Sequence, residues 1–370
     1  MTSPAPIDLS THGYCVQKWI GHWFHSMGDL YMARRNDATD HIIREIKHGL
    51  VDDTSDVVKE VVILRQLRHP HIIDCSSCFI HGDGLYIITP NFPYGAITDI
   101  LEASYQNGLP EKVISSVVYQ TLKALEYIHS KRIVHRGIRG SHLLVDFHGN
   151  ITLCGFRGAI QLPDGRHATC DFERNLTTML PWLAPEVISQ SLTGYNQKSD
   201  IYSLGVTICE LSNGIVPFRE MEPLRMLYQK GMMMINPRIA DNSTCNNTAT
   251  IPEHRNRFFS NTIHDFTSQC LRDNQYTRPS AVQLLSHTFT KSKRRNCLKY
   301  LDMALTLNQV QRESTRDPTL VEILPATQAP EWDYRPYPRD DNELEAEEDT
   351  LSEDDTQVEE DSDEEQVPSL

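Results

Sequence analysis

Three arginines, Arg44, Arg139 and Arg157, carry the side chains best suited to chemistry in this chain of 370 residues. A guanidinium group keeps its positive charge and offers a planar fork of N–H donors, so it can neutralise phosphate groups without a metal ion. The same fork pairs equally well with a carboxylate such as Glu60. Two interpretations therefore stay open: a metal-free nucleotide site, or ion pairs with Glu60 and other carboxylates that lock the chain in a closed arrangement.

Two segments of the chain resemble catalytic elements of protein kinases, but glycine stands where each element needs a carboxylate. Residues 133–142 read Ile-Val-His-Arg-Gly-Ile-Arg-Gly-Ser-His, which is similar to the kinase catalytic loop H-R-D-x-x-x-x-N. Gly137 takes the place of the aspartate base, and His142 takes the place of the metal-binding asparagine. Residues 153–157 occupy the D-F-G position, where Gly155 replaces the second metal ligand.

These replacements predict a kinase-shaped protein that does not transfer phosphate. A general base contributes about 10²–10⁴ in rate, and bound metal ions stabilise the charge of the transferred group. An atypical active kinase is the alternative interpretation. It would need another base and metal ligand, and the nearest polar side chains in the sequence, His142 and Asp146, do not stand at the required positions.

Further kinase landmarks occur in the expected order, which argues against an unrelated α/β domain. Arg44 replaces the strand lysine, and Glu60 stands where its partner is expected. Arg278 is expected to pair with Glu186 of the A-P-E element. The other landmarks are the segment 61–72 after Glu60, the strand 85–89 that runs into a hinge, the element 182–186, the start of a central helix at 199–205, and the element 278–281.

We therefore predict an α+β, two-lobed, protein-kinase-like fold over residues 13–292, with a small β-rich N-lobe at about 13–90 and a larger helical C-lobe at about 91–292. Hydrophobic periodicity supports this layout. Apolar residues recur every three or four positions between Ile114 and Ile128, and the stretch from Ile201 to Leu211 is apolar nearly all round, as a fully buried helix requires. Leu143–Val145 and Ile151–Leu153 are expected to form a hairpin.

Within kinases, the chain closely resembles the STRAD adaptors, which are pseudokinases related to the sterile-twenty group. The residues that carry this resemblance are 155–157, 180–187, 194–203 and 210–218. It covers about residues 13–292. It implies that the protein binds and allosterically activates a partner serine/threonine kinase of the liver-kinase-B type, together with an armadillo-like scaffold of the Mo-twenty-five family. A scaffold that does not activate its partner is the alternative.

The resemblance also implies a scaffold-docking motif near the C-terminus. The family pattern ends in Trp-Glu-Phe, and the nearest match here is Trp332-Asp333-Tyr334, which lies inside the predicted linker 293–339. Trp332 and Tyr334 are therefore candidate partner-binding residues. An aromatic pair without a function in a linker is the other interpretation.

Several replacements at the expected nucleotide site argue against tight binding. Only Gly21 matches the phosphate-covering loop G-x-G-x-x-G, since Trp23 and Ser26 take the other two glycine positions, and Ile42 narrows the space for adenine. Other features favour binding, because hinge contacts use main-chain groups. The candidate adenine contacts are the carbonyl of Pro90, the N–H of Phe92 and the side chain of Leu144.

The net charge of −15 arises from the C-terminus alone. Residues 340–370 contain 16 acidic and no basic side chains, whereas the preceding 339 residues have a balance of +1. A run of like charges without aromatic residues cannot bury enough surface to fold, so we expect a disordered acidic tail. It either keeps the protein soluble or docks a partner.

Cysteine usage and hydropathy indicate a reducing, cytoplasmic compartment. The nine cysteines include one C-x-x-C pair, Cys75 and Cys78, which lacks the second pair of ligands that a zinc site needs. There is no signal segment, and no apolar run reaches the ~18 residues of a membrane span. We expect neither membrane nor nucleic-acid partners. The basic run 291–295 leaves nuclear import open, against a cationic helix end favoured by the helix dipole.

Overall fold

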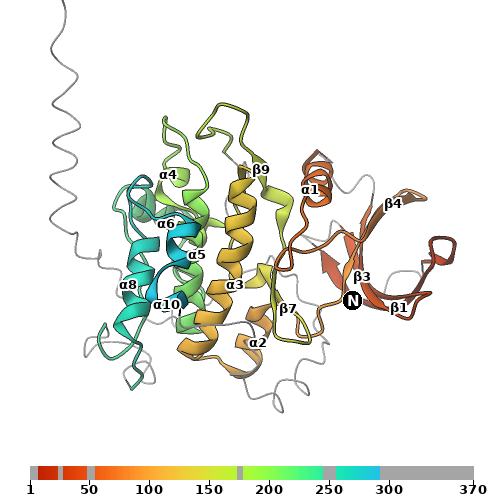
Figure 1. Ribbon diagram of the computed structural model, residues 1–370, viewed down its shortest axis with the longest axis horizontal. Helices are drawn as coiled ribbons and strands as arrows, with labels where there is room; N and C mark the ends of the chain where they lie inside the picture. The colour runs from red at the N-terminus through yellow and green to blue at the C-terminus, as the bar shows by residue number, and fades with distance from the viewer. Residues whose placement is uncertain (1–6, 24–27, 48–54, 173–177, 245–255, 292–370) are drawn as a thin grey trace, which may run out of the picture. The chain divides into compact units, whose positions relative to one another are not determined.

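A five-stranded antiparallel sheet forms the N-terminal region of the computed structural model (Figure 1). The structure describes residues 7–23, 28–47, 55–172, 178–244 and 256–291. The strands lie in the order β1-β2-β3-β5-β4. Their bounds are β1 Tyr14–Trp23, β2 Gly28–Arg35, β3 Asp40–Lys47, β4 Ser77–His81 and β5 Gly84–Pro90.

Alternation along β3 places its side chains in two different environments. Ile43 belongs to an apolar cluster on one face of the sheet, formed by Leu9, Tyr14, Tyr31, Ala33, Ile43, Tyr86 and Ile88. Arg44 projects to the opposite face, where it meets Glu60 of the helix α1, Ser55–Gln66. The period of the strand therefore aims Arg44 at α1 and away from the apolar cluster.

The C-terminal region is helical and is organised around two long helices, α3 Glu111–Ser130 and α5 Lys198–Asn213. Every residue of α5 after Lys198 is buried, and the helix ends at Gly214, which has the left-handed φ of 79° common at helix ends. Both helices were predicted from their apolar periodicity. The surrounding helices are α2 Ile97–Ser104, α4 Pro185–Ile188, α6 Pro223–Gly231, α8 Asn261–Cys270, α9 Ala281–Leu285 and α10 Thr288–Lys291.

Short strands between α3 and α5 carry the residues that resemble the catalytic loop. The predicted hairpin is confirmed, because β7 Leu143–Val145 pairs antiparallel with β8 Ile151–Leu153. A second pair joins β6 Ile133–Val134 to β9 Ile160–Gln161. Two 3-10 helices, η2 Gly140–His142 and η3 Phe156–Gly158, follow β6 and β8 respectively.

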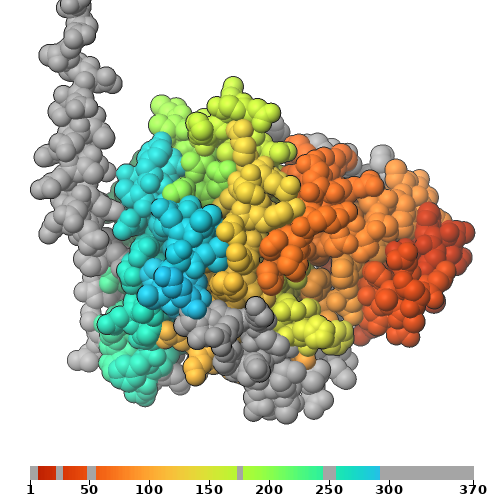
Figure 2. Space-filling model, viewed as in Figure 1, coloured from red at the N-terminus to blue at the C-terminus, as the bar shows by residue number. Residues whose placement is uncertain are grey.

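Main-chain hydrogen bonds connect the sheet-rich region to the helical region. Leu153 of β8 donates its N–H to the carbonyl of His71 at 2.9 Å and accepts from the N–H of Ile73 at 2.9 Å. The N–H of Arg68 donates to the hydroxyl of Tyr127 on α3 at 3.1 Å. In Figure 2 the orange surface around α1 adjoins the yellow surface of α3. β8, which leads into Gly155, is thus tied to the chain that follows α1.

The predicted ion pair between the A-P-E element and Arg278 is present. Arg278 is fully buried and donates to Glu186 through both terminal nitrogens, at 2.7 and 3.2 Å. Its Nε donates to the carbonyl of Arg272 at 3.0 Å, and its Nη1 also donates to the carbonyl of Lys198 at 2.8 Å. A bidentate, desolvated pair of this kind links two segments that are 92 residues apart in the chain.

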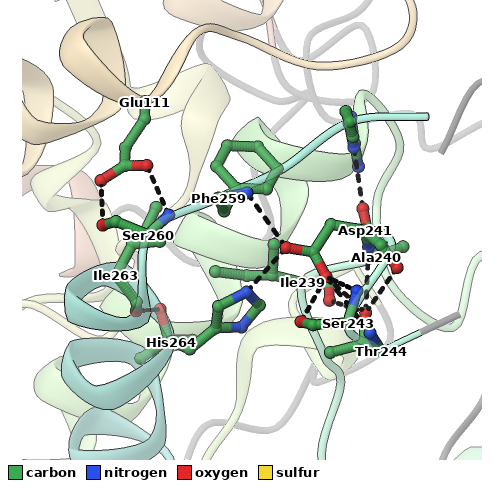
Figure 3. Close-up of polar contacts among 12 residues, drawn as sticks. Glu111, Ile239, Ala240, Asp241, Ser243, Thr244, Phe259, Ser260, Ile263 and His264 are labelled. Atoms are coloured by element: carbon green, nitrogen blue, oxygen red, sulfur yellow. Dashed lines mark hydrogen bonds and ion pairs between the residues drawn. The ribbon is translucent and has the colours of Figure 1, made fainter. Parts of the chain in front are cut away.

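A second buried carboxylate, Asp241, ties the chain after α6 to α8 (Figure 3). It accepts hydrogen bonds from Nε2 of His264 at 2.9 Å, from the N–H of Phe259 at 3.1 Å and from the hydroxyl of Ser243 at 2.6 Å. Burial raises the pKa of Asp241, but these donors outweigh burial and hold that pKa well below its usual range. Asp241 therefore stays ionised and acts as a structural anchor.

The described residues contain no helix that combines the length and apolar character needed to cross a bilayer. The predicted linker 293–339 and acidic tail 340–370 lie outside the described residues.

Candidate functional site

Asp200, in the first turn of α5, fixes the loop that resembles the kinase catalytic loop. Its side chain is fully buried and accepts the N–H groups of His135 and Arg136, both at 2.9 Å. Nε2 of His129 on α3 lies 2.9 Å from the same carboxylate. Two consecutive main-chain N–H groups on one carboxylate hold Arg136 in a left-handed conformation, with φ of 62°.

The three substituted positions, Gly137, His142 and Gly155, pack against one another. Gly155 has φ of 84°, and a Cβ atom there would lie only 2.4 Å from Nδ1 of His142. A Cβ atom on Gly137 would lie 3.3 Å from the same nitrogen and 3.3 Å from the ring of His135. The imidazole of His142 therefore takes the space that a side chain at position 155 would need.

Hydrogen bonds define the tautomer of His142. Burial, reinforced by the charge of Arg139, lowers the pKa of His142 well below its usual range, so the ring is neutral. Its Nδ1 lies 2.6 Å from the carbonyl of Gly137, which can only accept, so Nδ1 carries the proton. Nε2 then accepts from Nη2 of Arg139 at 3.1 Å. Both ring nitrogens are engaged within the protein, which leaves neither for a metal ion.

Within the described ranges, no group of three or more His, Cys, Asp or Glu side chains is placed to hold a metal ion. A divalent cation beside nucleotide phosphates prefers carboxylate oxygens, which Gly137 and Gly155 cannot supply.

Arg44 and Glu60 form the ion pair expected from the sequence. Arg44 Nη1 donates to Glu60 Oε1 at 3.2 Å, and Nη2 donates to Oε2 at 2.9 Å. The Glu60 side chain is 3% exposed and that of Arg44 is 15% exposed, so water screens the pair only weakly. Burial raises the pKa of the neighbouring Cys154 thiol to about 12, and Glu60, Arg139 and Arg44 also act on it. Glu60, Arg44 and Arg139 therefore all lie within electrostatic reach of Cys154, the residue before Gly155.

Helix α1 and Phe156, the aromatic residue after Gly155, both pack into the interior of the protein. Phe156 is fully buried and packs edge-on against His135, with ring centroids 4.5 Å apart. Helix α1 packs directly against η3, which contains Phe156. In protein kinases the strand–α1 ion pair must be in place for activity. The chain therefore has two features that accompany activity in protein kinases, the ion pair between strand and helix α1 and a buried aromatic residue after position 155.

Glu210 on α5 was not identified from the sequence, yet it joins the substituted loop to the A-P-E element. Its Oε2 accepts the N–H of Gly140 at 3.1 Å and Nε1 of Trp182 at 3.0 Å, and the guanidinium of Arg139 lies over the Trp182 ring at 5.7 Å. Burial raises the pKa of Glu210 to about 7, although these two hydrogen bonds and Arg139 oppose the rise. An acidic residue next to the apolar residues Ile208, Cys209 and Leu211 was the available signal.

The structure also places the predicted nucleotide contacts. Gly21 lies buried in β1 opposite Leu30 of β2, and Pro90 ends β5, with Phe92 two residues later. Leu144 lies in β7 and forms an isolated bridge with Ala96. Arg157 lies in η3, directly after Phe156. Ser26, Trp332 and Tyr334 are outside the described residues.

Comparison with known proteins agrees with this geometry. The protein kinase domain family model matches residues 25–290. The STE20-related kinase adapter protein strd-1 of Caenorhabditis elegans is 35% identical over 311 residues, which cover 81% of this chain and 79% of that protein. The chain belongs to the STE20-related kinase adapter family.

Vertebrate members of the family show the same relationship. The STE20-related kinase adapter protein alpha of Mus musculus is 33% identical over 318 residues, covering 76% of this adapter chain and 73% of the mouse protein. The beta protein of Homo sapiens is 29% identical over 313 residues, covering 75% of each chain. The resemblance to the STRAD adaptors is thus confirmed, and this family member is a kinase-like adaptor.

The packing of His142 against Gly155 predicts the outcome of restoring one carboxylate. Gly155→Asp places a Cβ atom 2.4 Å from His142 and is expected to cost ~1–3 kcal/mol of stability, a loss of several degrees in melting temperature. The double change Gly155→Asp with His142→Asn removes the imidazole and should recover most of that loss. Gly82→Asp is the matched control, because Gly82 has φ of 56° and nothing within 4 Å. Equal melting temperatures for the single and double variants would contradict this packing argument.

The pKa of Glu210 predicts a pH dependence of stability. Folding raises this pKa from 4.5 to about 7, so the stabilising contribution is complete below pH 4.5 and is lost as pH rises through 7. The loss amounts to about 3 kcal/mol. Glu210→Gln should abolish this pH dependence, because glutamine does not titrate. Compared with the wild type, the variant should therefore gain free energy of unfolding between pH 5 and pH 8, as measured by urea unfolding. Glu222→Gln, at an exposed position, should keep the wild-type profile. If Glu210→Gln kept the pH dependence of the wild type, Glu210 would not be its cause.

Proposed function

We propose that this adaptor does not transfer phosphate and that it binds and allosterically activates a serine/threonine kinase of the liver-kinase-B type. The main support for the proposal is that the chain keeps contacts typical of an active kinase, whereas a histidine ring fills the space at its catalytic positions. The Arg44–Glu60 pair and the inward Phe156 hold the shape of an active kinase, while His142 fills the space beside Gly137 and Gly155. A protein with this shape can present its substrate-facing surface to a real kinase.

The absence of phosphoryl transfer follows from the groups that the reaction requires. No carboxylate stands at position 137 to accept a proton, and no carboxylate or amide stands at 155 or 142 to hold a metal ion. Phosphoryl transfer depends on positioning and charge neutralisation, so these losses act together and one restored carboxylate is insufficient.

Activation of a partner requires differential affinity for its two states. A rigid surface that fits only the active conformation of the partner shifts the partner's equilibrium by the difference in binding free energy. The buried pairs Arg44–Glu60 and Arg278–Glu186 supply that rigidity on the two sides of the substituted loop. A scaffold that binds both states equally would leave partner activity unchanged, which separates the two functions experimentally.

The same residues fit a nucleotide better without a metal ion than with one. His142 occupies the space beside the metal positions, and the guanidinium groups of Arg44 and Arg139 are both close enough to Cys154 to lower its pKa, so they act there as fixed positive charges. The negative charges of the phosphate groups of bound ATP would be neutralised by these two guanidinium groups. In this arrangement Arg44 keeps its pair with Glu60, as the kinase lysine does while it contacts phosphate. The role proposed for ATP is therefore to stabilise the closed shape.

The proposed nucleotide site predicts binding that does not depend on magnesium. ATP at a hundred times its dissociation constant should stabilise the protein by ~2.7 kcal/mol, a shift of several degrees, equally with magnesium or with a chelator. Arg44→Ala should reduce the shift, whereas Arg34→Ala, which removes an exposed pair with Asp40 in the same sheet, should not. Labelled ATP should transfer no phosphate to the protein or to generic substrates. A shift that requires magnesium would contradict the site.

Partner activation and scaffold docking form the second prediction from this proposal. Purified partner kinase should gain at least fivefold activity when the adaptor and the armadillo-like scaffold of the Mo-twenty-five family are added, as expected for a coupling of 1–3 kcal/mol. Trp332→Ala should weaken scaffold binding by roughly thirtyfold, because aromatic anchors typically contribute ~2 kcal/mol. Truncation after Pro338 keeps the aromatic pair and should bind nearly as well. Binding without activation would favour the plain scaffold. A harmless Trp332→Ala with a disabling truncation would assign docking to the acidic tail.

A further inference from the structure

Two arginines in left-handed backbone conformation hold one segment of the chain. Arg132 and Arg136 flank β6, and both have φ of 62°, which is uncommon for residues other than glycine. Both side chains reach to residues 158–172, which we term the clamped segment. In protein kinases the corresponding segment often becomes ordered only when a phosphorylated residue pairs with arginine.

Arg132 binds the turn in the middle of the clamped segment. Its Nη2 donates to the carbonyls of Pro163 and Arg166, the latter at 2.6 Å, and its Nη1 donates to the carboxylate of Asp164 at 3.3 Å. The main chain supports the same contact, because the N–H of Leu162 donates to the carbonyl of Arg132 at 2.8 Å. The guanidinium of Arg132 thus donates hydrogen bonds to three acceptors on one surface turn.

Arg136 binds both ends of the clamped segment. Its Nε donates to the carbonyl of Gly158, and its Nη1 donates to the carbonyl of Asp171 at 2.8 Å and to the hydroxyl of Tyr195 at 2.9 Å. The Asp171 carboxylate lies 3.9 Å from the same nitrogen. The Arg136 side chain is 12% exposed, so most of its fork is already desolvated and in use.

The far end of the segment is paired with the chain before α5. Thr169 and Tyr195 exchange two main-chain hydrogen bonds, at 2.9 and 3.0 Å. A Cβ atom on Gly194 would lie 2.6 Å from the carbonyl of Thr169, so glycine is needed for this close approach. Thr169 is the only serine, threonine or tyrosine of the clamped segment, and its hydroxyl accepts the N–H of Asp171 at 3.1 Å.

We propose that Arg132 and Arg136 fix the clamped segment in this conformation without phosphorylation. The acceptors that a phosphate would supply are replaced by main-chain carbonyls, by Tyr195 and by the carboxylates of Asp164 and Asp171. The exposed turn at 163–167 is then a permanently formed surface held by Arg132. This inference goes beyond the proposed function and does not depend on the identity of the partner.

Limited trypsin digestion of the full chain tests the clamp, because Arg166 is exposed at its centre. Asparagine tolerates the left-handed conformation but has no guanidinium, so Arg132→Asn and Arg136→Asn remove the clamp while they keep the backbone preference. Each should accelerate cleavage after Arg166 at least tenfold, since cleavage follows the population of the open segment. Arg34→Asn, which removes an exposed pair in the sheet, is the matched control and should change the rate less than twofold.

Hydrogen exchange separates local opening from general unfolding. Amides of residues 159–169 should exchange faster in both clamp variants, whereas amides of α5 should keep their wild-type rates. Pretreatment of the wild-type protein with phosphatase should change neither cleavage nor exchange. Wild-type cleavage in both clamp variants, equal acceleration in α5, or faster cleavage after phosphatase would each overturn the proposal.

Discussion

The buried carboxylate of Asp200 is the interaction on which the substituted loop depends. It accepts the N–H groups of two successive residues, His135 and Arg136, at a point where the chain turns sharply out of β6. Buried main-chain donors require partners, and here one side chain of α5 serves both. The direction of the chain after Arg136 follows from this contact. Gly137, Arg139 and His142 reach their positions because the loop starts from a fixed point on the most buried helix of the protein.

The arrangement separates the shape of a kinase from the chemistry of a kinase. The ion pairs Arg44–Glu60 and Arg278–Glu186 join separate segments of the fold and carry out no chemistry themselves. The catalytic positions are different, since two of them are occupied by glycine and have no side chain of their own. Gly137 and Gly155 show this directly, because a neighbouring imidazole fills the space that they leave. An adaptor can therefore keep the first group of residues and lose the second.

Much of the fold was predictable because kinase landmarks and apolar periodicity report on local structure. The faces of α3 and α5, the β7–β8 hairpin, and the pairs of Glu60 and Glu186 all followed from residue types at fixed spacings. The contacts of His142 did not follow, because sequence spacing does not show that an imidazole at 142 meets the backbone at 155. Glu210 was missed for a related reason. The residues around Glu210 are nearly all apolar, so the sequence predicted only a buried helix. The fold was needed to show that Gly140 and Trp182 both bond to Glu210.

The contact between His142 and Gly155 also makes these two positions depend on each other. Position 155 cannot regain a side chain while the imidazole stands 2.4 Å from its Cβ position, and replacing His142 alone opens a gap beside two glycines and releases Arg139. Each single step towards an active kinase therefore costs stability before any catalytic group is complete. Positions 142 and 155 must therefore change together, and the kinase catalytic loop would also require a carboxylate at position 137. The packing of one imidazole thus couples a position of the loop that resembles the kinase catalytic loop to a position of the D-F-G element, so that a side chain at 155 requires a change at 142.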